Sequence, residues 1–180
     1  MKNVLVAMMV LFVAFGASAQ VPVPDFKNQP ALLKDGKIVK LEKQNSEIKG
    51  KVNGMGYGGT SQMLTIDGGS SPVSAPSKPE FVVKVDADAD PETIFYLAKC
   101  LEHKKVREVE VGKSSAFAAY GATGKSVKRN HVKLNFEKVS EGVYKIKPDE
   151  ALEEGEYSFV PNAGGAAGSM SAVYCFSVKK

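Results

Sequence analysis

The sequence contains no tryptophan, and phenylalanine and tyrosine together make up only 8% of its 180 residues. Grooves that bind single-stranded nucleic acid use stacked aromatic rings, and many sugar-binding platforms depend on the same rings. The excess of positive charge is also small, a formal net charge of +4 at pH 7. This composition argues against nucleic acid as a partner and weakens the case for a sugar-stacking surface.

Histidine and the motifs of common enzymes are equally scarce. The two histidines, His103 and His131, have no spaced acids around them that would form a zinc signature. No serine stands in the G-x-S-x-G pattern of a hydrolase. The sequence therefore predicts no catalytic residue and no cofactor. A secreted enzyme of hydrolase type, with scattered acidic residues or with His131 in a groove, stays open as an alternative.

Only two cysteines occur, Cys100 and Cys175, and both fall in runs that resemble strands. In an exported protein such a pair suggests a disulfide, and closing so long a loop would contribute about 4 kcal/mol. The alternative is two separate thiols that fill space in the core. No histidine stands beside either cysteine in a recognisable motif, which argues against a catalytic thiol.

Long hydrophobic runs are limited to the first residues, from Val4 to Phe15. Lys2 precedes this run, and Ala17-Ser18-Ala19 follows it, so residues 1–19 have the three parts of a secretory signal peptide. We expect cleavage before Gln20 and a secreted or periplasmic protein. A transmembrane helix needs about 20 apolar residues, and we expect no membrane span.

Short runs of alternating apolar and polar residues, separated by turn residues, make up most of the remaining chain. This pattern predicts an all-β fold, an antiparallel β-sandwich of the immunoglobulin-like or jelly-roll-like kind. Asp35-Gly36 between two apolar runs predicts a β-hairpin near the N-terminus. The strand-like runs are ALLK, KIVKLE, EIKGKV, QMLTID, EFVVKV, VREVEV, HVKLNFEKV, VYKIKP, GEYSFVP and VYCFSVK.

The segment from Gly68 to Pro79 is rich in glycine, serine and proline, which is typical of a loop or linker. On this basis residues 20–65 form an N-terminal hairpin and glycine-rich segment, and residues 66–180 form the β-sandwich domain. In the last run, alternation places Tyr174, Phe176 and Val178 on one face. We expect that face to be buried if this strand is central.

Two local patterns support the sandwich. In PETIFYLAKCLEH the β-branched and aromatic residues favour a turn that runs into a strand over a long helix. In LEEGEYSFVP, Tyr157 follows a glycine turn at the start of a late strand. A tyrosine in this position can bond to the backbone just upstream and fix the corner of a sandwich.

Three aspartates at alternate positions, Asp86, Asp88 and Asp90, resemble the start of a calcium loop. In an EF-hand the glycine of the sharp turn would fall at Pro91, and the closing glutamate at Leu97. Instead, Asp90 suits the N-cap of a short helical turn, with Pro91 at its first position. We therefore predict no metal site, and a weak calcium site of another type is the alternative.

A second pattern, AYGATGKS from Ala119 to Ser126, ends like a nucleotide-binding P-loop. Its first required glycine is replaced by Ala119, and it lacks the flanking strand and helix. A mobile loop from Gly112 to Lys128 is the better interpretation. The nearby basic residues have no interleaved aromatic ring and suggest a solvated face, with contact to an anionic envelope glycan as the alternative: Lys125, Lys128, Arg129 and Lys133.

From about Ile66 onward the chain resembles a group of exported bacterial proteins whose activity is unassigned. The resemblance is carried by IDGGSSPV, EFVVKV, ADPETIFYLAKCLEHKKVREVEVG, LEEGEYSFVP and the terminal YCFSV. It implies a small β-sandwich. It supplies no catalytic motif, and no functional residue follows from it.

Taken together, these features favour an exported β-sandwich that acts as an interaction or accessory module. Its partner would be a protein or an envelope glycan. Loops on a rigid sandwich are the usual place for binding, and the glycine-rich stretches Gly54–Gly59, Gly112–Gly124 and Gly164–Ser171 are the candidates. A calcium-stabilised adhesion module that uses Asp86, Asp88 and Asp90 is a further alternative.

Overall fold

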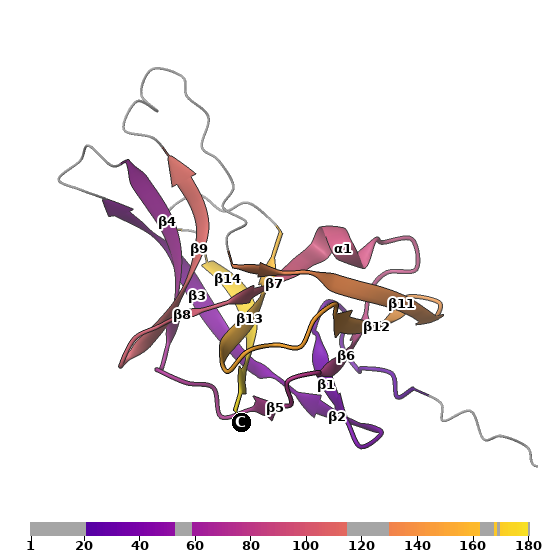
Figure 1. Cartoon of the computed structure of the whole chain (residues 1–180). Coiled ribbons are helices and arrows are strands. Elements are labelled where there is room, and N and C mark those ends of the chain that lie inside the picture. Colours follow the sequence, from indigo (N-terminus) through magenta and orange to yellow (C-terminus); the bar gives the residue numbers. More distant parts are fainter. Residues whose placement is uncertain (1–20, 53–58, 115–129, 163–167, 169, 180) are drawn as a thin grey trace, which may run out of the picture.

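The computed structural model describes residues 21–52, 59–114, 130–162, 168 and 170–179. Within them the chain is nearly all β-structure in two sheets that pack together, so the expected β-sandwich is confirmed (Figure 1). The smaller sheet has the strand order β11 (Leu134–Ser140), β12 (Val143–Pro148), β6 (Glu80–Lys84), β1 (Ala31–Lys34) and β2 (Lys37–Lys40).

The larger sheet holds the other strands that are described, antiparallel except for the short β5, which runs parallel to the end of β14. Its order is β10 (His131–Val132), β7 (Phe95–Lys99), β13 (Gly155–Pro161), β14 (Met170–Val178), β3 (Glu42–Val52), β4 (Thr60–Asp67), β9 (Val106–Ser114) and β8 (Leu101–Glu102), with β5 (Ser74–Ala75) beside β14.

The first hairpin of the small sheet follows from its turn residues. Asp35 and Gly36 both have positive φ, 51° and 71°, as a tight two-residue turn requires. Lys34 then pairs with Lys37, which confirms the hairpin predicted from the sequence. β1 also pairs with β6, so this hairpin is joined to the centre of the small sheet.

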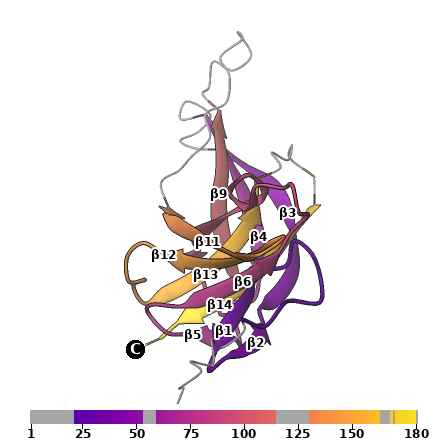
Figure 2. The same ribbon diagram turned by 90° about the vertical axis from the view of Figure 1, so that its right-hand side faces the viewer.

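The larger sheet curls back on itself. β8 follows β7 with only Cys100 between them, yet β7 pairs with β13 while β8 pairs with β9 at the other end of the strand order. The strands between them therefore enclose an interior of their own. Figure 2 views the molecule from the side of the small sheet, which covers the outer face of β13 and β14.

Aromatic rings fill the space between the two sheets. Phe159 on β13 and Phe176 on β14 each have their ring centroids 5.0 Å from that of Phe81 on β6. All three side chains are fully buried. Phe176 and Val178 belong to this core and Tyr174 packs against it, as the alternation of the last strand predicts.

The opposite faces of β13 and β14 line the interior of the curled sheet. Val160 of β13 and Val173 of β14 pack there with apolar residues of β3, β4 and β9. Because β13 is buried on both faces, five of its seven residues in a row are buried. The strand thus belongs to both cores and holds them together.

Two local predictions are also confirmed. The hydroxyl of Tyr157 donates a hydrogen bond of 3.0 Å to the carbonyl oxygen of Glu153, which fixes the corner before β13. A short helix, α1 (Pro91–Ile94), precedes β7, and Asp90 caps it by accepting from the backbone N–H of Glu92 at 3.0 Å.

The domain division expected from the sequence differs from this strand pairing. β3 lies between β14 and β4 and bonds to both, so residues before Ile66 contribute a central strand of the large sheet. The segment Gly68–Pro79 contains β5 and the buried Ser71, and it packs against the sheet. The glycine, serine and proline residues of this segment predicted its irregular backbone correctly, but such residues do not indicate which distant strands pair.

No helix in the described part of the chain is long and apolar enough to cross a membrane.

Candidate functional site

Arg107 on β9 is the most unusual side chain of the interior, because it is fully buried at 0% exposure. Alternation along β9 puts it on the same face as Val109, where an apolar residue is expected. The alternating V-R-E-V-E-V run predicts the strand but not the burial of this residue. The available signal was an arginine in the same alternation as Val109 and Val111, because arginine is almost never fully buried unless it is paired.

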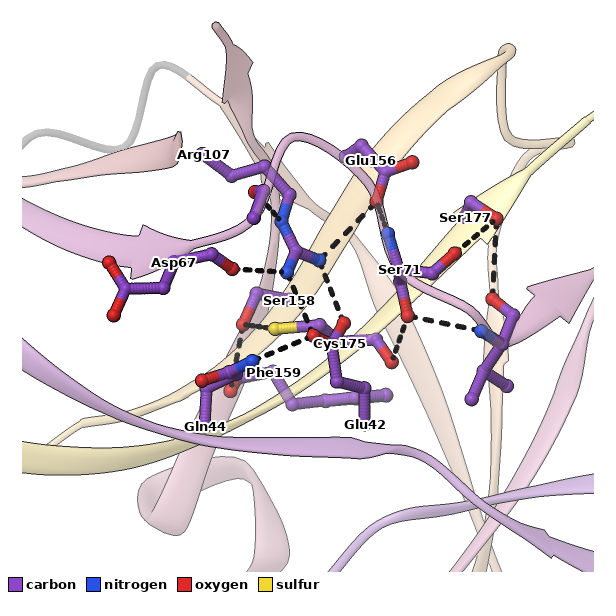
Figure 3. Close-up of polar contacts among 12 residues, drawn as sticks. Glu42, Gln44, Asp67, Ser71, Arg107, Glu156, Ser158, Phe159, Cys175 and Ser177 are labelled. Atoms are coloured by element: carbon purple, nitrogen blue, oxygen red, sulfur yellow. Dashed lines mark hydrogen bonds and ion pairs between the residues drawn. The ribbon is translucent and has the colours of Figure 1, made fainter. Parts of the chain in front are cut away.

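Every N–H of the Arg107 guanidinium has a partner (Figure 3). Its Nη1 and Nη2 donate to the two carboxylate oxygens of Glu42, each at 3.0 Å. Its Nε donates to the carbonyl oxygen of Gly68, and Nη2 donates also to that of Asp67, both at 3.0 Å. Nη1 makes a longer contact of 3.4 Å with Oε2 of Glu156.

Glu156 connects this cluster to the loop after β4. Its Oε2 accepts a 2.8 Å hydrogen bond from the backbone N–H of Ser71, and its own N–H donates to Oε1 of Glu102 at 3.1 Å. The loop lies very close to the turn between β8 and β9. A Cβ on Gly69 would be 2.8 Å from the carbonyl oxygen of Lys104, so only glycine fits there without a shift.

The two carboxylates of the cluster differ in their electrostatics. Burial by itself raises the pKa of Glu42, but the hydrogen bonds from Arg107, Gln44 and Ser71 together with the charge of Arg107 outweigh it, so the pKa lies below its usual value. For Glu156 burial dominates, and the pKa is raised despite the N–H of Ser71 and the charge of Arg107. Burial lowers the pKa of Arg107, but its hydrogen bonds to Glu42 and the negative charges around it together raise the pKa overall, so the guanidinium stays charged.

This cluster, Arg107 with Glu42 and Glu156, is a structural tie. It joins β9, β3, β13 and the loop after β4 at one point inside the curled sheet. Arg107 has no solvent exposure, and its donors are satisfied by the protein. The arrangement therefore holds strands together and offers no open position to a substrate.

The cysteines flank the same interior. Both are free thiols in the structure, so the disulfide weighed in the sequence analysis is not formed. Cys100 directly follows β7, Cys175 is on β14, and β13 lies between these two strands, so the two strand spacings exceed the Cα separation that a disulfide spans. Burial raises the pKa of the Cys100 thiol, and it raises that of Cys175 to about 11. Neither is a nucleophile at neutral pH.

The three alternate aspartates, Asp86, Asp88 and Asp90, have different surroundings. Asp86 forms an ion pair with Lys27 of the N-terminal segment, and Asp90 caps α1. Asp88 and Asp90 line a shallow hollow of about 350 Å³ together with Phe136 and Tyr144. Among the described residues, no three His, Cys, Asp or Glu side chains gather closely enough to hold a metal ion.

His131 does not join the acidic residues in a cleft. Its ring stacks on Tyr96 of β7 at a centroid distance of 3.9 Å. Lys133, the described member of the predicted basic cluster, is exposed. Lys125, Lys128, Arg129, the P-loop-like Ala119–Ser126 and most of the three glycine-rich stretches lie outside the described residues.

An apolar groove lies where the chain passes from the small sheet to the large one. Its cavity volume is about 430 Å³. One wall is the segment before β1, which includes Phe26; the other side is formed by Ile38 of β2, Leu41 and Tyr174 of β14. Phe26 is 57% exposed, which is high for so large a ring. The rest of the lining is Pro24, Asp25, Gln29, Pro30, Ala31, Lys40 and Lys43.

The groove is fixed in place by its surroundings. Asn28, in the segment before β1, has a positive φ of 58° and donates its backbone N–H to the carbonyl oxygen of Lys84 at 2.7 Å. Leu41 at its floor belongs to the core between the sheets. This groove is not predictable from the sequence, because its walls come from segments that meet only after the two sheets pack.

No protein-family model, curated protein or solved structure matches this chain. The function is therefore inferred from the molecule itself.

Proposed function

We propose that this protein is an exported binding module and that the groove between the segment before β1 and β2 is its binding site. The observation that carries the proposal is the exposed ring of Phe26 above a floor of core residues. Pockets for small molecules are mostly apolar, with a few polar groups, and measure about 300–1,000 Å³. A groove of about 430 Å³ fits that description.

The fixed walls support binding at this place. The hydrogen bond from Asn28 to Lys84 and the ion pair of Lys27 with Asp86 anchor the segment that carries Phe26. A ligand would then meet a preformed surface, which lowers the entropy lost on binding. Leu41 belongs both to the core between the sheets and to the lining of the groove, so the floor of the groove is part of the packed core.

The arrangement of titratable groups favours binding over catalysis. The buried acidic and basic side chains around Arg107 are bonded to one another. The groove instead presents rings and aliphatic side chains, with lysines and one aspartate at its rim. The signal peptide expected from the sequence would place this surface outside the cytoplasm, where an apolar component of the cell envelope is available.

Native mass spectrometry of the mature protein after incubation with an organic extract of its own cell envelope tests the proposal. We expect a retained small-molecule adduct in the wild type. A Phe26→Ser variant should lose it, because the ring that covers the ligand is removed. Val139→Ser is the matched control, since Val139 is an exposed valine on β11, on the opposite edge of the small sheet. An adduct equally strong in Phe26→Ser, or none in the wild type, would overturn the proposal.

A further inference from the structure

Lysines recur at every third position through the first hairpin and the strand after it. They are Lys34, Lys37, Lys40 and Lys43, and the last two line the groove. Within the described residues none of the four takes part in an ion pair. The rim of the groove therefore carries positive charge that the protein itself does not neutralise.

The acidic residues nearby do not cancel this charge. Glu42 lies between Lys40 and Lys43 in the sequence, but its carboxylate points into the curled sheet and is bonded to Arg107. Asp25 is the one acid in the lining of the groove. Two ammonium groups and one carboxylate leave a net positive charge at the binding surface.

Each of the two lysines is placed beside an aromatic ring of the groove. The Nζ atom of Lys40 lies 5.7 Å from the centroid of the Phe26 ring. Lys43 of β3 is the direct cross-strand partner of Tyr174 on β14. An aromatic ring and a lysine without an ion-pair partner among the described residues therefore occur together on both sides of the cavity.

We infer that the groove binds an apolar molecule that carries an anionic group, such as a carboxylate, sulfonate or phosphate. This inference rests on the proposed function and specifies its ligand. The apolar body packs between Phe26 and Tyr174 over the core residue Leu41, and the anionic group stays at the rim near Lys40 and Lys43. Asp25 attracts a cationic group and repels an anionic one, but two lysines stand against this one carboxylate in the lining, so the net charge of the groove favours an anion.

Two fluorescent probes separate the apolar requirement from the anionic one. 1-Anilinonaphthalene-8-sulfonate has two aromatic units and a sulfonate, whereas N-phenyl-1-naphthylamine has the same rings without the charge. We expect the mature protein to bind the sulfonate more tightly. That preference should shrink between 0.01 M and 1 M salt, because the Debye length falls from about 30 Å to about 3 Å.

Variants assign the preference to the groove. Replacing Lys40 and Lys43 by methionine keeps apolar bulk and should weaken binding of the sulfonate by about 2- to 5-fold per lysine. Binding of the uncharged probe should change less than binding of the sulfonate, because that probe has no charge for the lysines to attract. Lys138→Met is the control, because Lys138 is an exposed lysine on β11, away from the groove. Phe26→Ser should weaken both probes.

The outcomes distinguish the two proposals. If the probes bind equally well, or the lysine variant binds the sulfonate unchanged, the anionic ligand is wrong while the groove as a binding site stands. If Phe26→Ser leaves both affinities unchanged, the groove is not the binding site, and the proposed function falls with it. Circular dichroism and the unfolding midpoint of each variant show that a loss of affinity does not come from misfolding.

Discussion

Arg107 on β9 and Glu42 on β3 are joined by two hydrogen bonds of 3.0 Å, although β4 lies between their strands in the sheet. The guanidinium also donates to the carbonyl oxygens of Asp67, the last residue of β4, and of Gly68, so it reaches its partner at the end of β4. Bidentate pairs of this kind are strong and directional. The pair therefore fixes the curvature of the large sheet, and with it the position of β3 beside the groove.

Replacing Arg107 by methionine should destabilise the protein by about 3–5 kcal/mol, because Glu42 and Glu156 lose their buried cation. Urea unfolding measures the free energy. Combining this change with Glu42→Gln and Glu156→Gln should recover part of the loss, since buried charge is then absent. An Arg107→Met protein as stable as the wild type would contradict the structural tie.

The lowered pKa of Glu42 predicts a pH-dependent contribution to stability. A carboxyl whose folded pKa is depressed stabilises the fold above its unfolded pKa, near 4.5, and that contribution is lost as pH falls through the folded pKa. Glu42→Gln should therefore destabilise the protein at pH 7 and make a smaller difference in acid. Unfolding curves of the two proteins from pH 7 to about pH 3 measure the difference. A constant difference over this range would show that Glu42 is not ionised in the pair.

Glu156 should show the opposite sign, because its folded pKa is raised. A raised carboxyl pKa gives stability that is present at low pH and is lost as pH rises through the folded value. Glu156→Gln should accordingly cost less at pH 7 than Glu42→Gln, because glutamine keeps the acceptor for Ser71 without the buried charge. The same pH series measures it, and a larger cost at Glu156 would reverse this assignment.

Both cysteines should resist alkylation in the native protein. The thiols are buried, and burial raises their pKa. We expect iodoacetamide to modify neither at pH 7 in buffer and both in strong denaturant, without prior reduction. Intact mass after each treatment counts the modified thiols. If the denatured protein reacts only after a reductant is added, a disulfide joins Cys100 and Cys175.

Asp90→Ala should lower stability by about 1 kcal/mol, because α1 loses its N-cap. Since Asp90 acts on the helix and Asp86 on Lys27, the loss should be the same with calcium and with a chelator. Thermal unfolding in both conditions measures it. A calcium-dependent rise in the wild-type midpoint that disappears in Asp88→Ala would instead establish a metal site.

Phe176→Ala should cost about 3–5 kcal/mol, because a fully buried ring between the two sheets is removed. Deleting residues 20–55 should be at least as damaging, since β1, β2 and β3 are paired to the rest of both sheets. Chemical denaturation compares the two. A cooperative transition retained after the deletion would restore the domain boundary near Ile66.

Local chemistry made much of the fold predictable. The Asp35-Gly36 turn, the cap at Asp90, the corner at Tyr157 and the buried face around Phe176 depend on residues close in sequence. The place of β3 was not predictable in this way, because nothing in its own residues specifies β14 and β4 as neighbours. The groove was missed for the same reason: Phe26 and Tyr174 meet only through the tertiary fold.

The most direct test of the account is to find where a ligand binds. The two-dimensional NMR spectrum of ¹⁵N-labelled mature protein, titrated with 1-anilinonaphthalene-8-sulfonate, reports each backbone amide separately. We expect the largest shifts at residues of the groove: Phe26, Ile38, Lys43 and Tyr174. Largest shifts around Asp88 and Tyr144, or no saturable shifts at all, would contradict the groove as the binding site of this protein.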